Sequence, residues 1–139
     1  MPLDPVKISE TQSWLKKAAE DLRAAQHCLT ANTPLGSTAV FHCQQVVEKM
    51  LKGFLCWHDQ RFRKTHSIEE IGELCLKIDP TLKPLVDEAV VLTPYAWSFR
   101  YPGEIDEPTE TETKEGINIA KKVAEQILKR LPKETHPVK

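Results

Sequence analysis

The stretch VFHCQQVVEKMLKGFLCWH, residues 40–58, decides the fold. Its apolar side chains recur at helical spacing and spread over roughly 200° of the circumference, about twice the stripe of a helix that lies on a protein surface. This pattern predicts a helix from about Ser37 to His58 that is the central and most buried element, with enough apolar surface to share with a second subunit. The apolar positions are Val40, Phe41, Cys43, Val46, Val47, Met50, Leu51, Phe54 and Leu55.

The remaining arc of this helix is polar. Its members are His42, Gln45, Lys49 and Lys52. One interpretation is a solvated face with an ion pair between Glu48 and Lys52 at i,i+4, worth a few tenths of a kcal/mol. We prefer this interpretation for Lys49. Gln44 and Glu48 differ, because they lie at the margin of the apolar arc, where polar groups need partners.

Two further helices carry capping boxes, in which a serine is followed three residues later by Gln or Glu. Ser9 and Gln12 predict the start of a first helix, whose apolar stripe continues to residue 29. Ser67 and Glu70 predict the start of a third helix, which continues to residue 78. His66 is then the residue just before the N-cap of this third helix.

Asp79 followed by Pro80 suits the N-cap and the first position of a fourth helix. This helix should bend near Pro94 and end in YAWSFRYPG, residues 95–103. A fifth helix should begin at Thr109 or Thr111 and continue to about residue 131.

Strand-like alternation and internal repeats are both missing from the sequence. The pattern therefore predicts an all-α fold, an up-and-down bundle of about five helices with one longer acidic connection, PGEIDEPTE (residues 102–110). A chain of 139 residues fits one domain. We expect its core at about residues 9–131 and a loose tail at residues 132–139.

Charge and hydropathy restrict the possible functions. Nineteen Lys and Arg against twenty Asp and Glu give a net charge of -1, which argues against a general binder of polyanions. Any contact with a nucleotide or nucleic acid must come from a local site. The N-terminus has no apolar signal core, and no run of about 20 predominantly apolar residues could span a bilayer. We therefore expect a cytoplasmic protein that does not enter a membrane.

The four cysteines are Cys28, Cys43, Cys56 and Cys75. They form no C-x-x-C pair, which favours reduced and mostly buried side chains. His42 and Cys43 lie about 20 Å from Cys56 and His58 along one predicted helix, so these four residues cannot surround a metal ion. We expect neither a metal site nor a cofactor.

The connection RFRKTH, residues 61–66, gathers positive charge on an otherwise neutral protein. Arg61, Arg63 and Lys64 lie between His58 and His66. One interpretation is an exposed loop without a ligand. The other is a phosphate contact, aided by the free N–H groups of the helix that follows.

The segment YAWSFRYPG concentrates four aromatic side chains, most of which are expected in the core. Arg100 lies between aromatic neighbours. Its guanidinium could hold a phosphate with two hydrogen bonds, or it could pair with Glu48 or the acidic connection. We favour the ligand role, so Arg100 should contribute more to binding than Arg61.

Three segments together resemble the HEPN family of small helical domains. They are FHCQQVVEKMLKGFL (residues 41–55), KTHSIEEI (64–71) and FRYPGE (99–104). Their order and spacing extend the resemblance over about residues 9–131. The resemblance implies a bundle of four to five helices that usually dimerises, with a groove for nucleotides or polynucleotides. Many relatives are partners of a minimal nucleotidyltransferase encoded beside them, and others are RNA-cleaving toxins.

The cleaving relatives use an arginine, four to six further residues and a histidine. Arg61 and His66 have this spacing. In those relatives, however, the motif lies near the fourth helix, and a polar residue commonly occupies the position of Phe62. Arg100 has no histidine within the six residues after it. These departures favour a basic connection at Arg61 over a nuclease motif.

The resemblance therefore predicts a nucleotide- or RNA-binding module, a noncatalytic and homodimeric partner of a separate minimal nucleotidyltransferase. The expected ligand-binding residues are Gln44, Glu48, Lys49, Lys52, His66, Arg100 and Tyr101. The first alternative is a metal-independent ribonuclease of a toxin–antitoxin pair, with His66 as base and Arg61 or Arg100 as cation. The second is a protein-interaction scaffold that meets a basic partner through PGEIDEPTE.

Overall fold

A computed structural model describes residues 3–99, 102 and 107–137 of the chain. The five α-helices are α1 (Pro5–Cys28), α2 (Gly36–Trp57), α3 (Ile68–Ile78), α4 (Lys83–Ala89) and α5 (Glu110–Lys129). The three short 3-10 helices are η1 (Pro80–Leu82), η2 (Val90–Ala96) and η3 (Lys133–Thr135). The described residues contain no strand, so the predicted all-α fold is confirmed.

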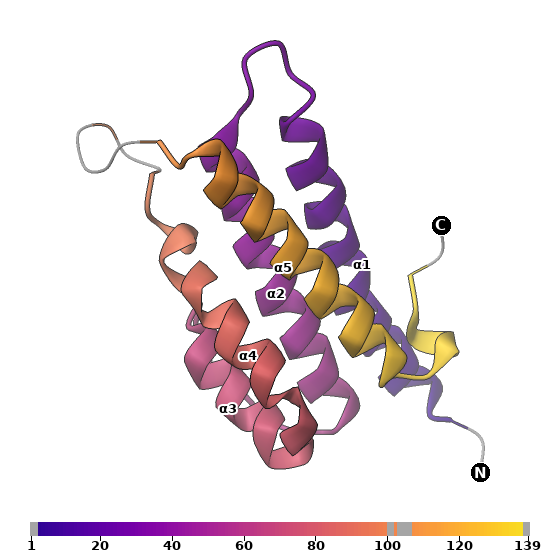
Figure 1. Cartoon of the computed structure of the whole chain (residues 1–139). Coiled ribbons are helices and arrows are strands. Elements are labelled where there is room, and N and C mark those ends of the chain that lie inside the picture. Colours follow the sequence, from indigo (N-terminus) through magenta and orange to yellow (C-terminus); the bar gives the residue numbers. More distant parts are fainter. Residues whose placement is uncertain (1–2, 100–101, 103–106, 138–139) are drawn as a thin grey trace.

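Helix α2 is the centre of the bundle. In Figure 1, α1 and α2 run antiparallel side by side, and α5 packs across them. Helices α3 and η2 also contact α2, while α4 contacts α3 and α5. Every apolar position predicted in α2 is buried except Phe41, which is half-buried. Helices of the same chain therefore cover the wide apolar arc of α2, and this arc gives no argument for a second subunit.

The start of α1 differs from the prediction. Asp4 is the N-cap, and its Oδ1 accepts a hydrogen bond from Val6 N at 2.9 Å. Pro5 occupies the first helical position. A backbone N–H at this position would have no partner within the helix, so the N–H that proline lacks costs no hydrogen bond. The capping box predicted at Ser9 and Gln12 is therefore wrong. Both residues lie inside the helix, and the Gln12 side chain binds the C-terminal segment instead.

Helix α3 begins at the predicted N-cap. Ser67 Oγ accepts a hydrogen bond from Glu70 N at 3.2 Å. The Glu70 carboxylate binds Arg63 instead of the backbone of Ser67, so only half of the predicted capping box forms.

The predicted fourth helix is divided into three pieces. Asp79 and Pro80 open the 3-10 helix η1, and the α-helical part ends at Ala89. The chain then continues as η2, which contains Pro94. A proline cannot donate the i→i−4 hydrogen bond of an α-helix, which favours the tighter 3-10 turns there.

Both ends of α5 are closed by specific hydrogen bonds. Thr109 and Glu112 form a complete capping box, which confirms one of the two predicted starts. After the helix, His136 Nε2 lies 2.8 Å from the carbonyl oxygen of Leu128. Thr135 is fully buried. The segment up to His136 is therefore packed, unlike the loose tail expected from residue 132, because His136 bonds to the last turn of α5 and Gln12 of α1 donates to its backbone carbonyl.

The four cysteines are unpaired, as the sequence predicts. Burial raises the pKa of the Cys43 and Cys75 thiols to about 12. Both thiols are therefore protonated at neutral pH and pack as small apolar groups. Within the described part of the chain, none of the helices has the length and apolar character needed to cross a membrane.

Candidate functional site

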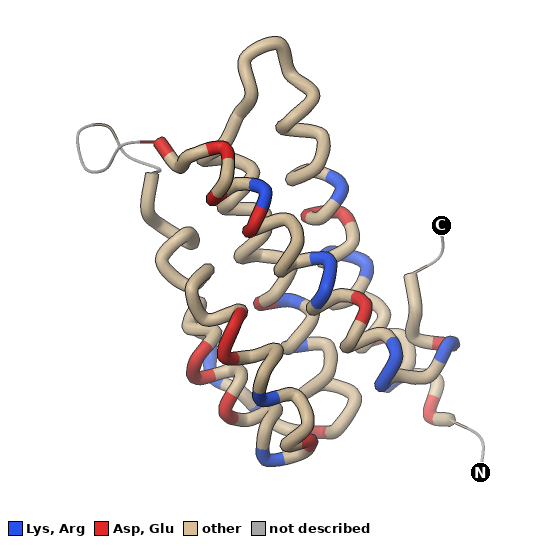
Figure 2. Tube along the Cα trace, in the orientation of Figure 1, with Lys and Arg blue, Asp and Glu red and all other residues tan. Residues whose placement is uncertain are grey.

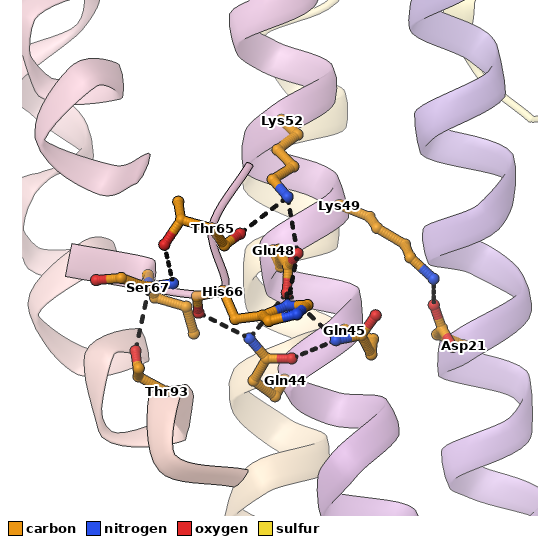
Figure 3. A network of polar contacts seen from close by, with 11 residues as sticks. Asp21, Gln44, Gln45, Glu48, Lys49, Lys52, Thr65, His66, Ser67 and Thr93 are labelled. Carbon is orange, nitrogen blue, oxygen red and sulfur yellow. Dashed lines mark hydrogen bonds and ion pairs between the residues drawn. The ribbon is translucent and has the colours of Figure 1, made fainter. Parts of the chain in front are cut away.

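A buried carboxylate lies at the centre of the candidate site (Figure 3). Glu48 of α2 is only 4% exposed and faces the connection between α2 and α3. Its Oε1 accepts a hydrogen bond from Lys52 Nζ at 2.8 Å, and its Oε2 accepts one from Gln44 Nε2 at 3.0 Å. His66 Nδ1 lies 3.0 Å from Oε2, and Gln45 Nε2 lies 3.2 Å from it. The polar residues at the margin of the apolar arc thus find their partners in one network.

Lys52 is buried because the connection folds back over it. It is 6% exposed, and its Nζ also donates a hydrogen bond to Thr65 O at 3.0 Å. The ring centroids of Trp14 and Phe62 lie 5.6 and 5.7 Å from the same ammonium, within the range of cation–π attraction. The predicted pair of Glu48 and Lys52 is present, but Lys52 is buried, so the predicted solvated face is wrong for this lysine. Glu48 has the polar partners that its position at the margin of the apolar arc led us to expect.

The backbone around His66 is held from two sides. Gln44, which is fully buried, donates a hydrogen bond to His66 O at 3.1 Å. Ile68 N, the first N–H group of α3, donates to Thr93 Oγ1 at 3.1 Å. The serine N-cap holds a second N–H group of this turn. Two backbone N–H groups in the first turn of α3 are therefore already hydrogen-bonded. Fewer of them remain for the anion contact that was predicted at this helix N-terminus.

The imidazole of His66 is the exposed member of the network. Its side chain is 65% exposed, whereas the side chain of Glu48, which holds Nδ1, is 5% exposed. A carboxylate partner at Nδ1 determines the orientation of the ring and which nitrogen remains available. Nε2 can accept a hydrogen bond in the neutral ring or donate one in the charged ring, which suits contact with a ribose hydroxyl or a phosphate.

Stability in acid is expected to depend on Glu48. Burial alone raises the pKa of its carboxyl, but hydrogen bonds from Lys52, His66 and Gln44 outweigh burial and hold the pKa below the ordinary value of 4.5. Because the folded-state pKa is the lower one, the ionised carboxylate stabilises the fold above about pH 4.5, and this stabilisation is lost as the pH falls through the folded-state pKa.

We expect the free energy of unfolding of the wild type to fall more steeply below pH 4.5 than that of Glu48→Gln. Urea unfolding of the two proteins at a series of pH values measures this difference. Parallel pH profiles would show that Glu48 does not contribute.

A second network lies on the α1 side of α2 and was not predicted. Asp21 is 9% exposed, and its Oδ1 lies 2.8 Å from His42 Nδ1. Its Oδ2 accepts a hydrogen bond from Lys49 Nζ at 2.6 Å (Figure 3). Lys49 is therefore an ion-pair partner and not the free, solvated lysine that we preferred. The available signal was position, because Asp21 shares the apolar stripe of α1 with Ala18 and Ala25.

The basic connection is exposed. Arg63 pairs with Glu70 at 2.8 Å, but its side chain is 74% exposed, so this pair contributes little to stability. Arg61 and Lys64 are exposed, and their side chains make no hydrogen bond or ion pair with the rest of the described chain. The structure thus brings His66, but not Arg61, to the buried network.

Two predicted ligand-binding residues, Arg100 and Tyr101, lie outside the described residues. Of the aromatic residues before them, Tyr95 packs against the core and Phe99 is half-buried. Trp97 is 53% exposed, so it is not one of the rings of this segment that lie in the core.

Charge is spread over the described surface. Figure 2 shows basic and acidic residues interspersed along the helices, as on α5, in agreement with the net charge of -1. Within residues 3–99 and 107–137, no group of three or more His, Cys, Asp or Glu is placed to hold a metal ion. The candidate site is therefore local: a buried network around Glu48 beneath an exposed histidine and a basic connection.

The fold and this network define a small helical domain. In it, Glu48 of the central helix α2 contacts His66, which lies just before α3. The family model of the HEPN domain matches residues 11–131, so the chain belongs to the HEPN family. The resemblance carried by three sequence segments is thereby confirmed, and the family is associated in general terms with nucleotides and RNA. A search of curated proteins found no match. A search of the solved structures found none either.

Proposed function

We propose that this chain is a nucleotide- or RNA-binding module that acts beside a separate minimal nucleotidyltransferase and has no catalytic activity of its own. The observation that carries the proposal is the exposed imidazole of His66, held through Nδ1 by the buried Glu48. A side chain whose orientation is fixed before binding loses less conformational entropy when a ligand arrives.

The proposed roles of the network residues are divided by exposure. His66, Arg61 and Lys64 are exposed and supply the contacts to phosphate. Gln44 and Lys52 are buried and position His66 and its backbone instead of touching the ligand. Arg100 and Tyr101 remain proposed ligand contacts on the basis of the family resemblance.

The test is the affinity of the protein for ATP and for a short single-stranded RNA, measured by calorimetry. We expect His66→Asn to bind about three- to tenfold more weakly, a loss of about 1 kcal/mol. Asparagine can keep a donor near the position of Nδ1, and thus the contact with Glu48, while it removes Nε2. The matched control is His27→Asn, because His27 is an exposed histidine in the last turn of α1, where no role in binding is proposed.

Unchanged affinity in a folded His66→Asn protein would exclude this site. A wild-type protein that binds neither ATP nor RNA would exclude the function.

The partner is tested separately, by co-expression with a minimal nucleotidyltransferase encoded beside this chain and gel filtration of the mixture. A homodimer remains part of the proposal through the family resemblance, and sedimentation at micromolar concentration tests it.

The second candidate function is a metal-independent ribonuclease. It is favoured by the contact of Glu48 with His66, because a carboxylate that orients an imidazole is an arrangement used for general bases. It is disfavoured by Arg61, whose side chain makes no hydrogen bond or ion pair with the described part of the chain. RNA cleavage in the presence of a chelator that disappears in His66→Asn would establish the ribonuclease over the noncatalytic module.

A further inference from the structure

A separate hollow lies near the N-terminal end of α2. Ser37, Thr38, Phe41, His42 and Phe99 line it, and its volume is about 340 Å³. This volume is within the range of small-ligand pockets, about 300–1,000 Å³. The lining combines two aromatic rings with two hydroxyl groups and an imidazole, so it offers both a stacking surface and hydrogen-bonding groups.

The backbone at one wall of the hollow is strained. Phe99 has a φ of 65°, in the left-handed region that non-glycine residues rarely adopt. Its ring is half-buried and lies 5.6 Å from the ring of Tyr95. Strained conformations of this kind concentrate at ligand-binding positions, where the surrounding structure holds them.

The imidazole of the hollow is oriented in the same way as that of His66. His42 Nδ1 lies 2.8 Å from Oδ1 of Asp21, whose other oxygen is held by Lys49. This leaves Nε2 of His42 as the nitrogen available to a ligand. His42 of α2 and His66, which precedes α3, are therefore each held through Nδ1 by a buried carboxylate, the first from α1 and the second from α2.

One wall of the hollow, Phe41, and the partner of His66, Glu48, lie along one strip of α2. Phe41, Gln45 and Glu48 follow one another at spacings of four and three residues, which places them on the same helix face. Phe41 and Glu48 are two turns apart, about 10 Å along the helix axis. A ligand that contacts both the hollow and His66, the partner of Glu48, must therefore extend along about two turns of α2, as successive units of one strand can.

We propose that this hollow binds a nucleobase of single-stranded RNA and that the same strand continues along α2 to His66. The proposal rests on the proposed function and deepens it, because it makes a polynucleotide, and not a mononucleotide, the ligand. Phe99 supplies the stacking surface, which accepts any base. His42 and the hydroxyl groups of Ser37 and Thr38 supply hydrogen bonds to its edge or its ribose.

The test compares a fluorescein-labelled oligoadenylate about eight nucleotides long with AMP and ATP, by fluorescence anisotropy and competition. The variants are Phe99→Leu, which keeps apolar volume but removes the stacking ring, and His42→Asn, which keeps the contact with Asp21. Trp57→Leu is the matched control, because Trp57 is a half-buried aromatic residue at the other end of α2.

We expect the wild type to bind the oligomer at least tenfold more tightly than AMP, and Phe99→Leu to weaken oligomer binding about five- to tenfold. Trp57→Leu should leave it unchanged. The losses in Phe99→Leu and His66→Asn should multiply in the double variant, because the two contacts are well separated. Ultraviolet cross-linking of the oligomer to the wild type should label the peptides that contain Phe41 or Phe99, which tests the hollow even if a variant fails to fold.

Three results would overturn the proposal. Oligomer binding that is lost in His66→Asn but unchanged in Phe99→Leu and His42→Asn would exclude the hollow and retain the proposed function. Equal affinity for ATP and the oligomer, with equal losses in Phe99→Leu, would make the site one for a mononucleotide. Absence of wild-type binding to all three probes would exclude both proposals.

Discussion

Replacing Glu48 with alanine is expected to lower the free energy of unfolding by about 3–5 kcal/mol. Lys52 is 6% exposed, and Glu48 is its only carboxylate partner among the described residues. The substitution would leave an ammonium group buried without an opposite charge, and it would also remove an acceptor from Gln44. Urea unfolding at neutral pH, followed by circular dichroism, measures the loss.

A matched control is available in the same protein. Lys83 and Asp87 form an ion pair of the same i,i+4 spacing, but both side chains are more than half exposed. Asp87→Ala should therefore cost no more than about 0.5 kcal/mol. The double variant Glu48→Leu/Lys52→Met should be more stable than Glu48→Ala, because it removes both charges together. A Glu48→Ala protein within 1 kcal/mol of the wild type would show that Lys52 finds water or another partner.

Replacing Gly72 with alanine is expected to destabilise the protein by about 1–3 kcal/mol. A Cβ atom at this position of α3 would lie 2.5 Å from Cγ1 of Val86 on α4. The valine side chain is short and branched at Cβ, so it has little freedom to move away. The two helices would have to separate, and this cost should exceed the gain in helix propensity that alanine brings.

Gly116→Ala is the matched control for this substitution and should have the opposite sign. A Cβ atom at Gly116 of α5 would meet Cys43 at 3.6 Å, an ordinary van der Waals distance. Alanine there should stabilise the protein by about 0.5–1 kcal/mol through helix propensity. Thermal denaturation of the two variants measures both effects. Equal shifts in the thermal unfolding midpoints of the two variants would show that the close approach of α3 and α4 at Gly72 does not determine the stability of Gly72→Ala. The combination of Gly72→Ala with Val86→Ala should recover part of the loss.

The helices could be predicted because their signals are local. The apolar arc of α2, the Ser67 N-cap of α3 and the Thr109 capping box of α5 all depend on residues within one or two helical turns. Errors occurred where two local signals competed. At the N-terminus, Asp4 and Pro5 start α1 before the serine motif that we chose.

The candidate site could be predicted only in part. Gln44 and Glu48 were identified because their positions at the margin of the apolar arc demand polar partners. Which partners they have depends on how the connection between α2 and α3 folds back over Lys52, and no local pattern encodes that path. Asp21 was missed for the same reason, since its partners lie on a different helix.

The sequence by itself determined the helical class, the central place of α2 and the membership in the HEPN family, because periodicity and motif order are properties of the chain alone. Only the tertiary structure decided that Glu48 and Lys52 are buried and that His66 and His42 are each held by a carboxylate. The physical reason is that burial and hydrogen bonding between distant residues depend on which helix faces meet. An isolated i,i+4 pair on a solvated helix and a buried ion pair read identically in the sequence, but the removal of one partner has very different consequences in the two environments.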